Sequence, residues 1–353
     1  MSKPIQFIVL GAGAIGCYFG ARLIAAGQQV VLVGRPRTID PLRLGGLRVT
    51  DLSGFAAQLS TEQLELATDL ASGMAAIQTR FSKLDKPDKL ENLVILLCVK
   101  GGATASAARE IAANCPPNTP VVSMQNGVEN VARIRSQAPT MDALAGMVPY
   151  NVGMRSPTHV HRGVNGSIAM QRSAVTKEIG LVFDAAGLPN RLHEDMVGVQ
   201  WGKLLINLNN PVNALSNLPL LDELRDWSYR RVFAALQIEA LAVLKCASVT
   251  PVKAGAVEPN VLPRILRLPN FLFERVAAKL LKIDPTARSS MWDDVQRGNI
   301  TEVDDLCGAV VRLAAQCGMQ APKNTLMCHL IAKLHKGESM SGPDLQLAVR
   351  KAV

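Results

Sequence analysis

One segment near the start of the chain constrains the fold more than any other. Residues 7–10, Phe-Ile-Val-Leu, form an apolar run of strand length, and Gly11-Ala12-Gly13-Ala14-Ile15-Gly16 follows at once. A stretch that is typical of an amphipathic helix begins directly after it. Gly-x-Gly-x-x-Gly between a buried strand and a helix indicates dinucleotide binding, because the backbone there can approach a pyrophosphate closely. The alternative is a glycine-rich turn without a ligand, and the flanking strand and helix argue against it.

Each glycine of this segment has its own expected role. Gly11 permits the tight turn out of the strand, Gly13 has no side chain to block the pyrophosphate, and Gly16 lets the helix pack close to the sheet. The N–H groups of the first helical turn face the anion. We therefore expect residues 11–16 to bind the cofactor.

The choice between NAD and NADP is made near the end of the next expected strand, residues 30–33. An NAD-selective site places Asp or Glu there, where its carboxylate accepts hydrogen bonds from the ribose 2′-OH. This chain has Gly34 at that place, followed by Arg35 and Arg37. A guanidinium pairs with a 2′-phosphate through two parallel hydrogen bonds. The pattern favours NADP(H), with solvated loop charge as the alternative.

The length and the change of pattern along the chain predict two domains. A chain of 353 residues is too long for one ordinary core. We expect an α/β Rossmann-type domain over residues 1–192 and an all-α domain over residues 193–353. Helical periods dominate the second part, and no convincing strand occurs there. The main helices are expected at residues 201–215, 230–246, 262–281 and 301–317, with a shorter one after Pro322.

Composition argues against several other classes of protein. The net charge is +9, but only 4% of the residues are aromatic and no basic tract occurs, so nucleic-acid binding is not expected. The longest apolar runs are strand-sized, well short of a membrane span. The cysteines and histidines form no metal-ligand spacing, so no metal site is expected. The first strand begins so early that we expect no signal peptide and a cytoplasmic protein.

Two polar residues follow buried strands in the first half. Lys100 comes after the apolar run 93–99, and Asn126 comes shortly after the run 121–124. Ligands of open α/β sheets bind at the carboxyl ends of the strands, so both residues are candidates for ligand contact. The alternatives are a surface lysine and a plain Asn-Gly turn.

The second half holds a helix with an unusual polar face. Lys203, Asn207 and Asn210 are spaced i, i+4 and i+7, which places them on one face of a single helix. A lysine and two amides on an otherwise apolar helix can donate to an anionic or carbonyl-bearing ligand, although a polar face that meets water is the alternative. Residues 288–304 are a second polar concentration, with an exposed loop and a helix start as the alternative.

The order and spacing of these elements resemble the ketopantoate reductases (2-dehydropantoate 2-reductases) over nearly the whole chain. The resemblance implies a Rossmann domain, a helical domain, and reduction of a small anionic 2-keto acid. The motifs that carry it are Gly11 to Gly16, the strand that ends in Lys100, Gln125-Asn126-Gly127, Lys203 to Asn207, Asn210-Pro211, Ser289-Ser290-Met291 and Thr301-Glu302-Val303-Asp304.

The resemblance also implies roles for individual residues. Lys203 is the general acid that protonates the C2 oxygen as NADPH delivers hydride, and Glu302 holds and tunes that lysine. The substrate-binding set is Asn126, Lys203, Asn207, Asn210 and Ser290. The cofactor-binding set is Gly11, Ala12, Gly13, Ala14, Ile15, Gly16, Arg35, Lys100 and Asn126.

Three departures from the family pattern leave alternatives open. Asn210 comes one residue early, Leu220 stands where many members carry a substrate-binding asparagine, and an insertion occupies about residues 70–92. The alternatives to ketopantoate reduction are reduction of another 2-keto acid and a non-catalytic NADP-binding sensor. A homodimer is compatible with the helical half, and the pattern does not decide it.

Overall fold

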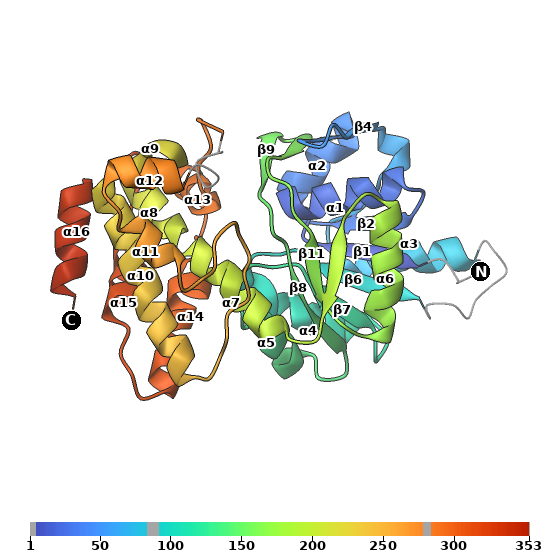
Figure 1. The fold of residues 1–353 in the computed structure, drawn as a ribbon. Helices are drawn as coiled ribbons and strands as arrows, with labels where there is room; N and C mark the ends of the chain where they lie inside the picture. Colours follow the sequence, from blue (N-terminus) through green and yellow to red (C-terminus); the bar gives the residue numbers. More distant parts are fainter. Residues whose placement is uncertain (1–4, 83–91, 278–283, 353) are drawn as a thin grey trace. The chain divides into compact units, whose positions relative to one another are not determined.

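The chain forms two compact units, Met1–Met196 (unit 1) and Val197–Val353 (unit 2). The computed structural model describes residues 5–82, 92–277 and 284–352. Unit 1 is an α/β structure and unit 2 is helical, as Figure 1 shows. The expected fold class, a Rossmann-type domain followed by a helical domain, is therefore confirmed. Residues 83–91, which belong to the insertion expected at about residues 70–92, lie outside the described residues.

Unit 1 is built on an eight-stranded sheet with the order β12-β11-β8-β7-β6-β1-β2-β5. Its middle strands β1 and β6 are buried along their whole length, which explains why they are almost continuous apolar runs. Strand β11 is antiparallel to β8, and the other neighbouring pairs are parallel. The strands are β1 (Gln6–Leu10), β2 (Gln29–Val33), β5 (Glu65–Ala67), β6 (Leu93–Leu97), β7 (Pro120–Ser123), β8 (Asp142–Met147), β11 (Ile168–Gln171) and β12 (Asn190–His193).

Helices cover both faces of this sheet. Side chains of successive strand residues point to opposite faces, so Phe7 and Val9 join one hydrophobic cluster while Ile8 and Leu10 join the other. The helices are α1 (Ala14–Ala25), α2 (Pro36–Gly45), α3 (Leu70–Ser82), α4 (Thr104–Asn114), α5 (Asn130–Gln137) and α6 (Ala174–Ala185), with short 3₁₀ turns η1 (Thr61–Gln63) and η2 (Gly101–Ala103). The sequence patterns did not predict α2, which contains two prolines, or the short and polar α5.

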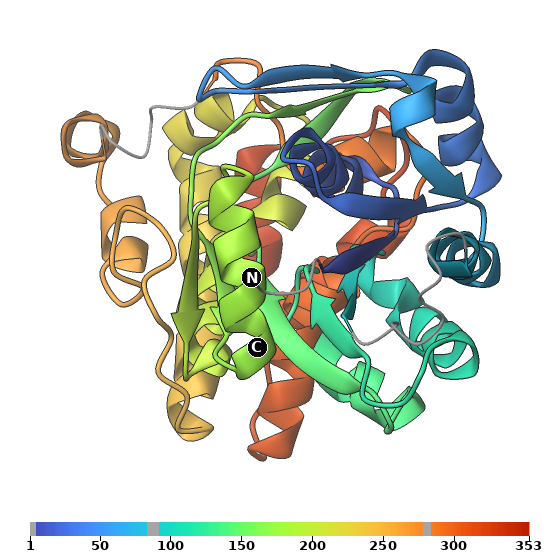
Figure 2. The ribbon, with the colours of Figure 1, turned by 90° about the vertical axis from the view of Figure 1, so that its right-hand side faces the viewer.

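A second sheet of four strands, in the order β4-β3-β10-β9, packs on α1. Figure 2 shows these strands lying across that helix. The strands are β3 (Leu47–Asp51), β4 (Ala56–Leu59), β9 (Val152–Ser156) and β10 (His159–Arg162). Strand β3 pairs in parallel with β10, more than a hundred residues later in the chain. Apolar and polar residues alternate only weakly in β3 and β4, so the sequence pattern did not assign strands there.

Unit 2 contains ten helices and no strand within its described residues. The longest helix, α10, packs against α8, α9, α11, α14, α15 and α16. The helices are α7 (Met196–Asn207, which begins at the last residue of unit 1), α8 (Asn209–Ser216), α9 (Leu220–Arg225), α10 (Trp227–Cys246), α11 (Leu262–Leu266), α12 (Asn270–Val276), α13 (Ser290–Gln296), α14 (Val303–Gln316), α15 (Pro322–Lys333) and α16 (Gly342–Lys351).

Two of the expected helices are wrong in extent. The helix expected at 201–215 is divided between α7 and α8, because Pro211 has no N–H to donate to the carbonyl of Asn207. The helix expected at 262–281 is divided between α11 and α12 by Pro269, whose backbone is extended. Residues 278–281 of that expectation lie outside the described part. None of the helices in the described part of the chain is both long enough and apolar enough to cross a membrane.

Candidate active site

The glycine-rich segment between β1 and α1 is shaped by close backbone contacts. Gly11 has φ +111°, and a Cβ there would lie 2.6 Å from the backbone of Cys98. A Cβ on Gly16 would collide with the carbonyl oxygen of Gly11. A Cβ on Gly13 would meet nothing within 4 Å. Two of the glycines are therefore required by the turn itself, and the space beside Gly13 is open.

Four strands end at the same edge of the sheet in unit 1. Backbone hydrogen bonds join their ends, from Cys98 to Leu10 (2.8 Å), from Gly11 to Val33 (2.9 Å) and from Met124 to Leu97 (2.9 Å). Strand β1 lies between β6 and β2, so the sheet reverses its winding there, which is where ligands of such sheets bind. This edge brings together the predicted cofactor residues of unit 1: residues 11–16, Arg35, Lys100 and Asn126.

The end of β2 carries glycine for a steric reason. A Cβ on Gly34 would lie 2.8 Å from the Cβ of Ala12 in the glycine-rich segment. Arg35 then forms the N-cap of α2, and Arg37 lies in its first turn, both with exposed side chains. Two guanidinium groups at a helix N-terminus suit an anion.

A buried network holds the loops that carry Lys100 and Asn126. The Nε2 of Gln125 donates to the carbonyl of Val99 (2.9 Å) and to the Oγ1 of Thr104 (2.8 Å). The Nδ2 of Asn130 donates to the carbonyl of Asn126 (2.7 Å), and Asn130 Oδ1 accepts from Thr104 (3.0 Å). Sequence reasoning noted Gln125 as part of a motif but missed Thr104 and Asn130, because nothing local marks a buried polar pair.

In unit 2, α7 carries Lys203 and Asn207 one turn apart. Lys203 is half-buried and Asn207 is buried. Burial lowers the pKa of Lys203 from its usual 10.5 to about 8. Gly202 precedes the lysine, and a Cβ there would collide with the carbonyl oxygen of Val252, so α7 packs tightly against that segment. This role of Gly202 was not predicted.

Asn210 does not lie on the same helix as Lys203 and Asn207. The expectation of one continuous helix is wrong, because the helix is interrupted at Leu208 and Asn210 is the second residue of the next helix. The physical cause is Pro211, which has no backbone N–H to continue the helical hydrogen bonds. Asn210 is half-buried at the start of α8.

The structure brings Asn210 to the start of α13, where Ser290 lies. The backbone N–H of Ser289 donates to Asn213 Oδ1 (2.9 Å), and the Ser289 hydroxyl donates to the carbonyl of Asn210 (3.3 Å). The same hydroxyl caps α13 by accepting from the N–H of Trp292 (3.1 Å). Two predicted substrate residues, far apart in sequence, are thus held together by Ser289 and Asn213, whose positioning roles were not predicted.

Glu302 lies at the start of α14. It is the N-cap residue, its carbonyl accepts from the N–H groups of Asp305 and Leu306, and its side chain is half-buried. A carboxylate at a helix N-terminus is favoured by the helix dipole.

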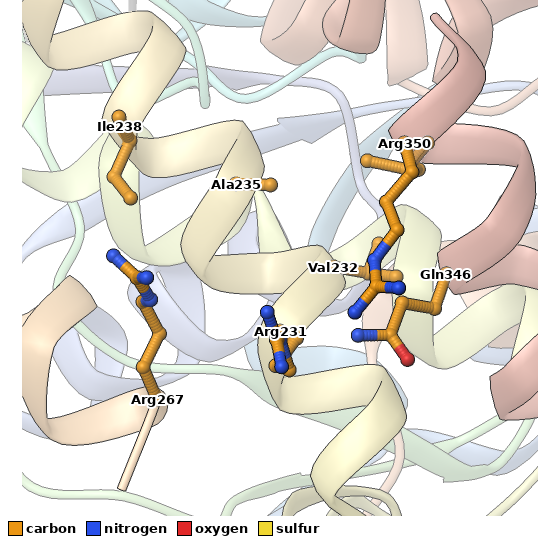
Figure 3. Close-up of a pocket in the computed structure, with 8 residues that line it drawn as sticks. Arg231, Val232, Ala235, Ile238, Arg267, Gln346 and Arg350 are labelled. Atoms are coloured by element: carbon orange, nitrogen blue, oxygen red, sulfur yellow. The ribbon is translucent and has the colours of Figure 1, made fainter.

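A separate cavity of about 190 Å³ lies at α10 and α16 of unit 2. Figure 3 shows the guanidinium groups of Arg231, Arg267 and Arg350 around it. None of the predicted site residues lines this cavity. Among the residues that the structure describes, no group of three or more His, Cys, Asp and Glu side chains is arranged to hold a metal ion.

Two family models match the chain. Residues 7–174 match "Ketopantoate reductase PanE/ApbA", and residues 195–335 match "Ketopantoate reductase PanE/ApbA C terminal". The chain is 26% identical over 333 residues to 2-dehydropantoate 2-reductase from Pyrococcus horikoshii, covering 93% of this chain and 96% of that protein. The enzyme of the same name from Mycobacterium tuberculosis is 22% identical over 330 residues, covering 93% of this chain and 97% of that protein.

Solved structures share the fold. The PanE/ApbA family ketopantoate reductase from Ralstonia eutropha superposes with a TM-score of 0.75 at 27% identity, covering 93% of this chain and 97% of that one. D-mandelate dehydrogenase with NADH and anilino(oxo)acetate superposes with a TM-score of 0.72 at 16% identity, covering 98% and 100%, which shows a shared fold alone. The chain belongs to the ketopantoate reductase family and is an oxidoreductase that acts on a CH–OH group.

Proposed function

We propose that this chain reduces 2-dehydropantoate to pantoate with hydride from NADPH, and that Lys203 is the general acid. The relatives named 2-dehydropantoate 2-reductase support the substrate. The observation that carries the mechanism is the burial of Lys203, which lowers the pKa of its ammonium group to about 8. A general acid works best when its pKa lies near the working pH.

NADPH is the proposed hydride donor, and residues of unit 1 hold it. The backbone turn at Gly11 and Gly16 and the open space beside Gly13 fit a pyrophosphate. Arg35 and Arg37 at the start of α2 fit the 2′-phosphate, and Lys100 and Asn126 fit the nicotinamide ribose and the phosphates. The bound cofactor supplies hydride to C2 of the keto acid.

The side chains of unit 2 do the rest of the chemistry. Hydride addition builds negative charge on the ketone oxygen, so a cationic donor there stabilises the transition state more than the ground state. Lys203 Nζ gives its proton to that oxygen, which becomes the hydroxyl, and Lys203 regains a proton from solvent. Asn207, Asn210 and Ser290 bind the hydroxyl and carboxylate of the substrate, and Glu302 holds Lys203.

The decisive experiment follows the loss of NADPH absorbance with ketopantoate and a panel of other 2-keto acids. We expect Lys203→Ala to lower kcat by about 10²–10⁴-fold, the usual contribution of general acid catalysis. Lys245→Ala, an exposed lysine of α10, is the matched control and should leave turnover intact. Undiminished turnover in Lys203→Ala would show that the mechanism is wrong.

The pH dependence tests the same assignment. The active form of Lys203 is protonated, so kcat for reduction should fall as the pH rises through about 8. A rate that does not change between pH 7 and 9 would contradict the role of Lys203. This test requires that hydride transfer limits kcat. An isotope effect on kcat when the transferred hydride is replaced by deuteride establishes that.

The preference for NADPH is tested at Arg35. Arg35→Ala should raise the KM for NADPH and leave the KM for NADH unchanged, because only NADPH carries the 2′-phosphate. Arg43→Ala, on the last turn of the same helix, is the control. An equal effect on both cofactors would argue against a 2′-phosphate contact.

Another 2-keto acid is the second candidate substrate. Leu220, the apolar first residue of α9, stands where many family members have an asparagine that binds substrate. Faster turnover of another acid in the panel would keep the mechanism and change the substrate. NADPH binding with no turnover of any acid would support a sensor instead.

A further inference from the structure

A buried carboxyl group in unit 2 has no part in the chemistry described above. Glu223 lies on α9 and is 0% exposed. Its Oε2 accepts a hydrogen bond from Asn213 Nδ2 at 2.7 Å, and the Asn209 side chain also hydrogen-bonds to it. Within the described residues no cation forms an ion pair with this carboxyl, whose surroundings act on it through burial and these two amides.

Two acceptor atoms near this group lack a donor. Glu223 Oε1 and Asn209 Oδ1 are both buried without a hydrogen-bond partner in the described part of the chain. A proton on Glu223 turns Oε1 into a donor and removes the electrostatic cost of a buried charge. Burial raises the pKa of Glu223 to about 8, although the two amides favour its ionised form. Burial and the Oε1 atom without a donor together favour the neutral form of this carboxyl.

Glu223 is the inner end of a chain of hydrogen bonds that reaches the candidate site. Asn213 Nδ2 donates to Glu223 and to the carbonyl of Leu218 (3.0 Å), so its amide has one orientation. Its Oδ1 then accepts from the N–H of Ser289, and the Ser289 hydroxyl donates to the carbonyl of Asn210. Asn213 is 0% exposed and Ser289 is 2% exposed, so water does not compete for these bonds.

We propose that Glu223 is a positioning residue: a neutral carboxyl that fixes the Asn213 amide and, through Ser289, sets the start of α13 against the start of α8. Ser290 and Asn210, the residues proposed to bind substrate, lie at those two helix starts. The importance of Glu223 for the reaction therefore rests on the proposed function. The neutral state of Glu223 and its positioning of α13 do not depend on that function.

Two other ionisable side chains, Tyr229 and Asp226, lie near Glu223. Tyr229 of α10 interacts with Glu223, and burial raises the pKa of its phenol above 10, so it stays neutral. Asp226, just after α9, is the N-cap of α10 and accepts from the N–H of Ser228 (2.7 Å). Because Lys203 on α7 also has a pKa of about 8, the contribution of Glu223 is obtained as the difference between the wild type and Glu223→Gln.

The kinetic test compares Glu223→Ala with Glu223→Gln. The alanine removes the acceptor for Asn213, so KM for the keto acid should rise at least tenfold while KM for NADPH stays within twofold. Glutamine is neutral and has the same shape, with an N–H₂ in place of the acidic O–H, so it should restore KM to within twofold. An unchanged KM in Glu223→Ala, or a glutamine variant as impaired as the alanine one, would overturn the proposal.

Glu239→Ala is the matched control. The Glu239 carboxylate also accepts from an asparagine side chain, Asn324 Nδ2 (2.9 Å), but this bond joins α10 to α15. The variant should leave KM for the keto acid within twofold. A tenfold increase in KM for the keto acid in Glu239→Ala would show that the loss of any Glu–Asn hydrogen bond in unit 2 has this effect. That result would contradict a specific role for Glu223.

Two readouts need no catalysis and separate this proposal from the proposed function. The melting temperature of the wild type should fall relative to that of Glu223→Gln as the pH rises from 5 to 8, because only the wild type must keep a buried proton.

Glu223→Ala should also shift tryptophan emission, and Trp292→Phe should abolish that shift, because Ser289 caps the turn that carries Trp292. If the wild type turns over no keto acid, the proposed function fails and these two results still decide the role of Glu223. Parallel melting curves or an unchanged emission would reject it.

Discussion

Two buried carboxyl groups, one in each unit, have pKa values shifted in opposite directions. Asp51 at the end of β3 accepts hydrogen bonds from Tyr18 (3.0 Å), from the N–H of Ser53 (2.8 Å) and from that of Phe55 (3.0 Å). Two buried arginines, Arg22 (3.3 Å) and Arg162 (3.1 Å), form ion pairs with it. Burial by itself raises the pKa of Asp51, but these donors and charges outweigh it, so the net pKa lies below 3.8. Glu223 is also buried but has two amides and no ion pair within the described residues, and its pKa is raised to about 8.

The difference teaches that burial alone does not decide whether a carboxyl is charged. The number of donors and the presence of cations decide it. Asp51 holds the second sheet to α1 as a charged centre, and Glu223 joins α9 to α8 as a neutral one.

The two groups also give opposite pH dependence of stability. The folded-state pKa of Asp51 is depressed, so its contribution is present above its unfolded pKa near 3.8 and is lost as the pH falls through the folded value. The folded-state pKa of Glu223 is raised, so its contribution is full below about 4.5 and is lost as the pH rises through about 8.

The largest expected effect is that of Asp51→Ala. The change leaves Arg22 and Arg162 buried without a counter-charge, so the free energy of unfolding should fall by about 3–5 kcal/mol. Urea denaturation measures it. Asp40→Ala removes an exposed partner of Arg43 and should cost less than about 1 kcal/mol. Equal losses in the two variants would mean that the Asp51 cluster does not stabilise unit 1.

Glu223→Ala should have a smaller effect on stability. The change leaves Asn213 without one acceptor, but it leaves no buried charge without a partner. We therefore expect the free energy of unfolding to fall by about 1–3 kcal/mol in the same urea experiment at pH 6. A loss as large as that of Asp51→Ala would break the comparison, because it would indicate that Glu223 is charged and paired.

The isosteric amides sharpen the comparison. Asp51→Asn removes the charge that two arginines need and should be destabilising at pH 7, with the difference from wild type shrinking as the pH falls below 4. Glu223→Gln should be close to neutral at pH 6 and more stable than wild type at pH 9. Thermal unfolding of both variants across pH 3–9 checks this, and two curves with the same slope against pH would contradict it.

The smallest effect on the free energy of unfolding is expected for a partly exposed ion pair of unit 2. Lys323 Nζ lies 3.6 Å from Glu239, and its side chain is 32% exposed. Lys323→Ala should change the free energy of unfolding by less than about 1 kcal/mol, and added salt should reduce the difference further. A loss comparable to that of Glu223→Ala would show that the pair is better shielded from solvent than its exposure indicates.

Much of the fold could be predicted because its signals are local. The apolar run before Gly11 and the run 93–97 are strands that a two-sided sheet requires, and the helical half shows a clear helical period. Helix α2 and helix α5 were missed because prolines and polar residues obscure their pattern. The break at Leu208 was missed although Pro211 is visible in the sequence, because the i, i+4, i+7 spacing suggested one continuous helix.

The sequence by itself determined the fold class, the family and the residues that motifs mark, including Gly11, Lys203 and Glu302, because chain geometry and motif spacing are local properties. Only the tertiary structure decided which buried polar groups hold the start of α13 and the second sheet in place. Glu223, Asn213 and Ser289 are separated by up to 76 residues, and Asp51 meets Arg162 from another strand. The ionisation of a buried carboxyl depends on donors that folding brings from distant parts of the chain, so no local pattern of residues can reveal it.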